Sequence, residues 1–517
     1  MNNKQCCIDI ERLLNFAIKH ELIEKLDVVP CRNALMELFN IRECYGERVE
    51  YKDSDTVAEI LESLLNYASE VGMLTSNTTT YRDLLDTKIM GILMPRESEV
   101  VKKFIETTKN SGIEKATDQY YAMSKSSNYI RMDRINKNLY WTTGTEYGNL
   151  EITINLSKPE KDPKDIAAAK CLPQLEYPKC LLCKENVGFA GNLNRPARQN
   201  HRVIPVNLAE ENWYFQYSPY VYYNEHCIVF KGEHVPMKIS KNTFVRLFDF
   251  VSQFPHYFVG SNADLPIVGG SILTHEHFQG GRHVFPMEVA KSEAVFFHDE
   301  YKDVKASIVK WPLSVIRLSS KNKDTLIKIS DDILTKWREY NDETAGILAY
   351  STENGEIVPH NTITPIARIN KSGEYESDLV LRNNRTNEEY PDGIFHPHKK
   401  LHHIKKENIG LIEVMGLAVL PARLKKELTS IEKILIGEES ISTIDEKSEL
   451  SKHKSWIEEM LENYGIIENR EKAGKVLKLE VGNIFSKVLL DAGVFKKNEK
   501  GLSAFVRFMN AAGFQES

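Results

Sequence analysis

The residues best suited to chemistry lie in one short segment near the middle of the chain. The segment reads His-x-His-x-Gln, at His275, His277 and Gln279, between two Gly-Gly pairs. The composition of residues 271–278 predicts a short buried strand, on which alternate side chains share a face, about 6–7 Å apart. Two imidazoles and an amide beside glycine N–H groups suit a site that handles phosphate. The alternative is a pair of structural histidines on an edge strand.

A Cys-x-x-Cys pair, Cys180 and Cys183, precedes this segment. Such a pair supplies half of a tetrahedral zinc site from one tight turn, and a redox pair is the alternative interpretation. Two of the three histidines His226, His234 and His275 would complete a Cys2His2 set. Zinc bound there would tie the loop after residue 180 to the His-x-His strand.

Three loop residues and a second histidine cluster are further candidates. Asn194, Arg195 and Asn207 would bind a base, a ribose or a phosphate, or serve as ordinary turn residues. His396 and His398 repeat the spacing of the first histidine pair 121 residues later, which indicates two related halves. Their cation-rich surroundings suit a sugar phosphate or a second metal. The alternative is an exposed basic loop.

The elements that must position these residues change in type along the chain. Residues 5–130 have helical periodicity, with a capping box that begins at Thr56. Residues 150–156 alternate with period two and predict a strand, and a charged, proline-broken connector follows at 158–164. The later expected elements are a helix around 330–341, a strand at 409–416 and helices from 424 onward.

Composition limits the class of protein. The chain has 517 residues, 42% of them hydrophobic and 27% charged, which indicates a soluble globular protein of several structural units. A formal net charge of −6 argues against a general nucleic-acid binder. We see no signal peptide and no apolar run that would span a membrane. The eight cysteines are sparse, so we expect reduced thiols or metal ligands and a cytoplasmic protein.

Taken together, these motifs resemble one enzyme family. Residues 264–281, residues 150–164, the Cys180–Cys183 pair and the His396 cluster are similar to the type 2 galactose-1-phosphate uridylyltransferases, which belong with the histidine-triad proteins. The resemblance covers nearly the whole chain. It implies an α+β fold of two histidine-triad-like halves, with antiparallel sheets flanked by helices. The implied parts are a helical N-terminal extension at 1–135, a catalytic half with a zinc site at 136–300, a second half at 301–425 and a helical C-terminal region at 426–517.

The resemblance also implies a reaction in galactose catabolism. UMP would pass from UDP-glucose to galactose 1-phosphate through a covalent uridylyl-histidine, giving UDP-galactose and glucose 1-phosphate. His277 matches the nucleophile and Gln279 the amide that contacts phosphate. The implied ligands of a structural zinc are Cys180, Cys183, His234 and His275. We expect a cytoplasmic homodimer that binds neither nucleic acid nor membrane.

The remaining substrate-binding candidates come from several segments. Glycine amides and a following arginine would stabilise phosphate charge, and Lys406 and Glu413 resemble a hexose-phosphate-binding strand. The full set is Asn194, Arg195, Asn207, Gly280, Gly281, Arg282, His396, His398, Lys406 and Glu413. Two other functions stay open: a dinucleoside polyphosphate phosphorylase using the same histidine, and a zinc-stabilised nucleotide-binding protein without turnover.

Overall fold

The structure forms two compact units. This computed structural model describes residues 3–44, 49, 55–157, 165, 169, 176–270 and 272–517, so the connector at 158–164 and Ser271 lie outside the described residues. The first unit comprises Met1–Lys137, Ser157–Val235 and His275–His277, and the second comprises Asn138–Leu156, Pro236–Thr274 and Phe278–Ser517. The four-part division expected from the sequence stays a prediction.

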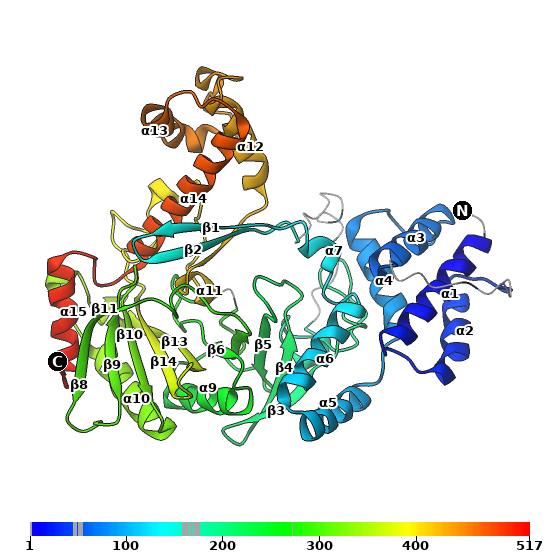
Figure 1. Ribbon diagram of the computed structural model, residues 1–517, viewed down its shortest axis with the longest axis horizontal. Coiled ribbons are helices and arrows are strands. Elements are labelled where there is room, and N and C mark those ends of the chain that lie inside the picture. The colour runs from blue at the N-terminus through cyan, green and yellow to red at the C-terminus, as the bar shows by residue number, and fades with distance from the viewer. Residues whose placement is uncertain are drawn as a thin grey trace. The chain divides into compact units, whose positions relative to one another are not determined.

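The first unit begins with a series of helices (Figure 1). The expected capping box is confirmed, because Thr56 Oγ1 accepts from the Glu59 backbone N–H while the Glu59 carboxylate accepts from Thr56 N–H. The helices are α1 (Asn3–Lys19), α2 (Val28–Leu38), α3 (Val57–Glu70), α4 (Thr79–Ile92), α5 (Glu97–Ser111), α6 (Ile113–Ser126) and α7 (Met132–Ile135).

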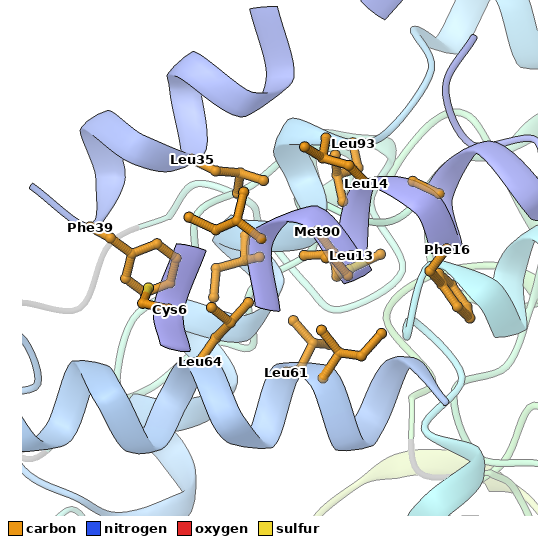
Figure 2. Close-up of a cluster of buried hydrophobic side chains, with 14 of the residues drawn as sticks. Cys6, Leu13, Leu14, Phe16, Leu35, Phe39, Leu61, Leu64, Met90 and Leu93 are labelled. Carbon is orange, nitrogen blue, oxygen red and sulfur yellow. The ribbon is translucent and has the colours of Figure 1, made fainter. Parts of the chain in front are cut away.

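The apolar faces of α1 to α4 pack into one core. Figure 2 shows side chains from these helices pointing toward one another. Helical periodicity put these residues on one side of each helix, and burial of that side is what stabilises the bundle. The residues labelled in the figure are Cys6, Leu13, Leu14, Phe16, Leu35, Phe39, Leu61, Leu64, Met90 and Leu93.

Tyrosine hydroxyls join the later helices to the strands of the first unit. Tyr120 on α6 donates to the carbonyl of Arg202 (2.6 Å), and Tyr217 donates to the carbonyl of Thr117 (3.0 Å). Both aromatic side chains are buried, and hydrogen bonding satisfies their polar ends. The strands form an antiparallel sheet in the order β5 (Cys227–Lys231), β4 (Glu211–Tyr217) and β3 (Ile204–Leu208).

The second unit is built around a long antiparallel sheet. Its strands follow in the order β16 (Phe514–Glu516), β8 (Ser292–His298), β9 (Lys305–Val309), β10 (Val315–Ser320), β14 (Tyr375–Asn383), β13 (Asn361–Ile369), β6 (Phe258–Gly260) and β7 (His277–Gly281). A smaller sheet pairs β1 (Leu139–Thr145) antiparallel with β2 (Gly148–Ile154), which pairs parallel with β15 (Leu417–Leu420). A hairpin joins β11 (Tyr350–Glu353) and β12 (Glu356–Pro359).

Helices cover both faces of the long sheet. In Figure 1, α9 (Lys241–Gln253) and α10 (Lys323–Glu339) lie along one face of it. The short helix α11 (Leu411–Val414) lies on the opposite face, where a Cβ added at Gly260 would come within 2.7 Å of Leu411 Cδ1. The C-terminal helices are α12 (Arg423–Leu435), α13 (Lys454–Tyr464), α14 (Arg470–Ala492) and α15 (Glu499–Ala511).

The expected α+β class, with antiparallel sheets flanked by helices, is confirmed. The strand expected at 150–156 is β2, and the helix expected at 330–341 lies within and just beyond α10. Of the helices in the described part of the chain, none is long and apolar enough to cross a membrane.

Two expected strands were wrong. The strand expected at 271–278 begins only at His277, so His275 lies before β7 rather than on it. Within 409–416, the structure has the short helix α11 (Leu411–Val414) instead of a strand, because the Glu413 carboxylate accepts from the Gly410 N–H (3.2 Å) and caps a helical turn. Apolar runs of this length are ambiguous between the two structures when only periodicity is used.

Candidate active site and metal centre

Four side chains of the first unit form a cluster of metal-type donors. Cys180 and Cys183 precede the short 3-10 helix at Lys184–Asn186, His234 follows β5, and His275 precedes β7. Their Sγ and ring nitrogen atoms all lie within 4.8 Å of one another. The structure therefore brings together all four residues that the resemblance implied.

The distances in this cluster fit a tetrahedral site. Cys180 Sγ lies 3.5 Å from Cys183 Sγ and 3.2 Å from His275 Nδ1, and Cys183 Sγ lies 3.2 Å from His234 Nδ1. Zinc with bonds of about 2.0–2.3 Å separates its tetrahedral donors by about 3.3–3.8 Å. Two thiols and two imidazoles at these separations fit a zinc ion in chemistry and in size.

Neighbouring polar groups orient the four donors. His275 Nε2 donates to the Lys231 carbonyl (2.8 Å), which leaves the Nδ1 lone pair facing the cysteines. Asn186 Nδ2 donates to the carbonyls of Cys180 (2.8 Å) and Cys183 (2.7 Å) and so braces the Cys-x-x-Cys turn. Burial raises the pKa of Cys180 to about 11, so a thiolate there requires a nearby cation. Sequence reasoning missed Asn186, because nothing in its spacing marks it.

His277 is a buried imidazole with one ring nitrogen in a hydrogen bond to the backbone. Its Nδ1 donates to the His275 carbonyl (2.8 Å), which leaves the lone pair on Nε2. Burial lowers the pKa of His277 to about 4, so the ring is neutral at pH 7. A neutral imidazole whose tautomer is fixed in this way is suited to nucleophilic attack.

The remaining motif residues lie on or just after β7. Alternation along the strand places Gln279 on the same face as His277. Gly280 and Gly281 pair with β6, which keeps their backbone inside the sheet. Arg282 follows the strand and is half-buried. These four residues therefore follow the nucleophile candidate closely along the chain.

The two alternative histidines beside β5 have different environments. His226 is buried against the Tyr223 ring at 4.6 Å, and its Nδ1 donates to the Tyr220 carbonyl (2.8 Å). His234 instead faces Cys183. The donor cluster thus contains His234 and not His226.

The loop candidates of the first unit have local partners. The backbone N–H groups of Asn194 and Arg195 both donate to Asn192 Oδ1, at 2.8 and 2.9 Å, and the Asn194 side-chain amide donates to the Ala169 carbonyl (2.8 Å). Asn207 is exposed on β3. These contacts explain the turn, and a substrate role for the three candidates stays a prediction.

The second histidine pair is not arranged like the first. His396 is buried, and burial together with the positive charge of Arg382 lowers its pKa to about 4. His398 Nε2 donates to the Ile394 carbonyl (3.2 Å), and its Nδ1 lies 3.4 Å from the Asp491 carboxylate. Among the residues that the structure describes, neither histidine belongs to a group of three or more donors able to hold a metal.

A buried ion pair lies close by in sequence. Lys405 Nζ contacts the Glu413 carboxylate (2.9 Å), and both side chains are nearly inaccessible. The neighbouring candidate Lys406 is exposed. A substrate-binding role for Lys406 and Glu413 stays a prediction, and the contact between Lys405 and Glu413 was not expected from the sequence.

Comparison with known proteins gives a consistent result. The sequence profile for the galactose-1-phosphate uridyl transferase N-terminal domain matches residues 28–236, and the profile for the C-terminal domain of the same family matches residues 250–456. A crystal structure of yeast Ap4A phosphorylase Apa2 aligns with 77% of this chain and 94% of its own, at 10% identity and a TM-score of 0.34, which is too low to support an argument.

Three curated relatives match along nearly their full length, and each is named galactose-1-phosphate uridylyltransferase. The protein of Caldanaerobacter subterraneus is 65% identical over 100% of both chains. Those of Clostridium acetobutylicum and Bacillus subtilis are 55% and 50% identical, over 97% and 98% of this chain and 99% and 97% of their own. The chain therefore belongs to the galactose-1-phosphate uridylyltransferase family.

Proposed function

We propose that the protein transfers UMP from UDP-glucose to galactose 1-phosphate, producing UDP-galactose and glucose 1-phosphate. The observation that carries this proposal is the buried, neutral imidazole of His277, with Nδ1 occupied and Nε2 left as the nucleophilic atom. Relatives that match over the whole chain and share one enzyme name support the choice of substrates.

The reaction proceeds in two displacements at phosphorus. His277 Nε2 attacks the α-phosphorus of UDP-glucose, the P–O bond breaks, and its electron pair leaves with glucose 1-phosphate. A phosphate oxygen of galactose 1-phosphate then attacks the uridylyl-histidine, and the electron pair of the P–N bond returns to Nε2. No separate base is needed, because the ring is already unprotonated at neutral pH.

Hydrogen-bond donors stabilise charge on the nonbridging phosphate oxygens. Gln279 lies on the face of β7 that carries His277, and Gly280, Gly281 and Arg282 follow it. A donor side chain carried by a strand requires little reorganisation as charge develops, whereas the backbones of Gly280 and Gly281 pair with β6 and let the phosphate approach closely because they carry no side chain. The other candidates would bind the nucleoside or the hexose: Asn194, Arg195, Asn207, His396, His398, Lys406 and Glu413.

Zinc is the ion that we propose for the cluster of Cys180, Cys183, His234 and His275. When bound, it would supply a fixed positive charge that stabilises both thiolates. A metal that holds the His275 ring would also restrict its backbone carbonyl. That carbonyl accepts the hydrogen bond from His277 Nδ1, so the orientation of the proposed nucleophile depends on it. A fixed His275 therefore fixes the tautomer of the adjacent catalytic ring.

Incubation with UDP-glucose alone tests the proposal. We expect about one glucose 1-phosphate released per site, with UMP retained on His277, as intact mass and peptide mapping would record. A nucleotide-binding protein without turnover would release none. A dinucleoside polyphosphate phosphorylase would instead cleave a dinucleoside polyphosphate with inorganic phosphate as acceptor. Either of these two results would contradict the proposal.

The assembly and compartment are part of the same proposal. We infer a homodimer acting in the cytoplasm on small-molecule substrates, with no nucleic-acid or membrane partner. Sedimentation equilibrium of the purified protein would test the dimer. A monomer across the range of assay concentrations would overturn it.

A further inference from the structure

The long sheet of the second unit carries two kinds of buried arginine. Arg317 and Arg368 are paired, since Arg317 Nε lies 2.7 Å and Arg368 Nη2 lies 2.6 Å from the carboxylate of Asp378. Arg382, on the same strand as Asp378, is 1% exposed. Its Nη1 donates to the Ile409 carbonyl (2.9 Å), but its Nε and Nη2 have no hydrogen-bond partner among the described residues.

A buried guanidinium without a carboxylate partner lowers the stability of the folded protein. Burial removes water from its N–H groups, and no hydrogen bond from the described residues replaces that water at Nε and Nη2. Burial lowers the pKa of Arg382 to about 10, and the charge of Glu413 opposes that shift. The Glu413 carboxylate is already bound to Lys405 Nζ (2.9 Å) and to the Gly410 N–H (3.2 Å). The Glu413 charge therefore stabilises the charged form of Arg382 through space and not through a hydrogen bond.

The two unpartnered nitrogens have a particular shape. Nε–H and Nη2–H form one edge of the planar guanidinium and point in parallel, which matches two oxygens of a phosphate or carboxylate. One more polar side chain of the same unit, the hydroxyl of Thr364, is buried without a hydrogen-bond partner in the described chain. His396 is also buried; neither ring nitrogen meets a partner at hydrogen-bond geometry among the same residues, although Asn408 lies near enough to raise the pKa of the ring slightly against the effect of burial. A phosphate offers acceptors for all three groups.

The strand register places Thr364, Arg382 and Gln279 on one face of the sheet. Thr362, Thr364 and Ile366 alternate along β13 and therefore share one face of the sheet. Arg382 pairs directly with Thr362, so its side chain lies on that same face. Ile366 is paired with Gly260, which is paired with Gln279. Gln279 is in register with Asp378, so it lies about 14 Å to the side of Arg382 across three strand spacings and about 14 Å away along the strands. The two backbones are therefore about 20 Å apart before either side chain extends.

Backbone geometry brings His396 to the loop that precedes β7. Gly393 has φ +121, and a Cβ there would lie 2.9 Å from His396 Cβ and 3.1 Å from Ile267 Cγ2. Ile267 itself has φ +71, an unfavourable value for a β-branched residue that only surrounding structure maintains. The close packing of Gly393 against His396 and Ile267 therefore fixes the position of the His396 side chain.

We propose that Arg382, Thr364 and His396 form the oxyanion site for the phosphate of the sugar phosphate, with Arg382 gripping two oxygens through Nε and Nη2. This inference rests on the proposed function and assigns part of its acceptor site. Arg382 acts there as a binding residue and takes no part in bond making at His277.

The test compares Arg382→Gln and Arg382→Lys with Arg368→Lys as the matched control. We expect KM for galactose 1-phosphate to rise about 10- to 100-fold in Arg382→Gln, and less in Arg382→Lys, which keeps charge without the fork. Inhibition by UMP, which lacks the hexose phosphate, should stay within about 3-fold of wild type. Arg368→Lys breaks an ion pair that is already satisfied, so it should lower the melting temperature and leave KM unchanged.

A binding measurement separates failure of this inference from failure of the proposed function. Glucose 1-phosphate should raise the melting temperature of wild-type protein, and free glucose should raise it less. The two ligands should give equal shifts in Arg382→Gln, whereas part of the difference should remain in Arg382→Lys. Equal KM values in wild type and both Arg382 variants would overturn the assignment while leaving uridylyl transfer intact. Loss of the thermal shift for every ligand in folded wild-type protein would instead count against the sugar-phosphate substrate itself.

Discussion

Two pairs of histidines in this chain have the same spacing and different surroundings. His275 and His277 lie where the chain enters β7, with one ring turned to the cysteines and the other hydrogen-bonded to the first residue's carbonyl. His396 and His398 lie in a loop, one beside Arg382 and the other bound to the Ile394 carbonyl. Identical spacing therefore places one ring among four possible metal donors and fixes the tautomer of the other at the first pair, and does neither at the second pair in the described chain. The partners available to each ring decide its chemistry.

The first and largest test of this contrast is His277→Ala. We expect turnover to fall by roughly 10³-fold or more, because no other group on the motif strand can carry UMP. Steady-state kinetics with UDP-glucose and galactose 1-phosphate would measure it, and circular dichroism would check the fold. Activity near the wild-type level in a folded variant would show that another residue is the nucleophile.

The second test removes the metal donors. Cys183→Ser or treatment with a strong chelator should release bound zinc and lower stability by several kcal/mol, a loss of about 5 °C or more in melting temperature. Asn186→Ala should weaken zinc affinity by about 10- to 100-fold, because it loosens the turn without removing a donor. Elemental analysis and calorimetry would record both. Full stability without metal would contradict a structural role.

The third test measures how the stability of the protein depends on pH through His396. Burial and Arg382 lower the folded-state pKa of His396 to about 4, below the unfolded value of about 6.5, so the unfolded chain binds the proton first. The contribution of this ring to stability is therefore full above pH 6.5 and lost as the pH falls toward 4. At pH 5 about 2 kcal/mol of this contribution has already been lost. His396→Asn should flatten the pH dependence of unfolding by that amount, and an unchanged slope would contradict the assignment.

The smallest effect should come from His398→Ala, the position equivalent to His277 by spacing. Among the described residues its ring contacts a carbonyl, a carboxylate and the Tyr390 ring at 4.2 Å, so we expect kcat to change by less than about 3-fold, while a substrate-binding role would raise KM. The same kinetic assay measures it. A loss approaching that of His277→Ala would mean that the two pairs share a role after all.

The sequence predicted the donor cluster better than it predicted the local structure that carries it. Cys180 and Cys183 followed from residue type and spacing, and the resemblance chose His234 and His275 from three candidate histidines. The expected strand through His275 was wrong, since the ring points to the cysteines from outside β7. Metal-type donors are chemically recognisable in a sequence, whereas the start of a strand depends on which neighbour it pairs with.

Long-range contacts account for the residues that the sequence did not reveal. Asn186 binds two carbonyls within a turn, and Lys405 reaches Glu413 only because of how the chain folds after residue 401. Nothing in the sequence distinguishes Arg382 from the other arginines. Its position became clear only from the strand register, which places it near the buried hydroxyl of Thr364. Helical periodicity, a local property, did reveal the core of α1 and α3.

The path of the chain around His275–His277 has a practical consequence for dissecting the protein. These three residues belong to the first compact unit, although the segments on both sides of them belong to the second. A gene fragment that stops at residue 235 would encode three of the four sulfur and nitrogen donors, yet lack the fourth donor, His275, and the proposed nucleophile, His277. Neither half can therefore be expressed as a self-sufficient catalyst, and co-expressed pieces would regain activity only by reassembling around that tripeptide.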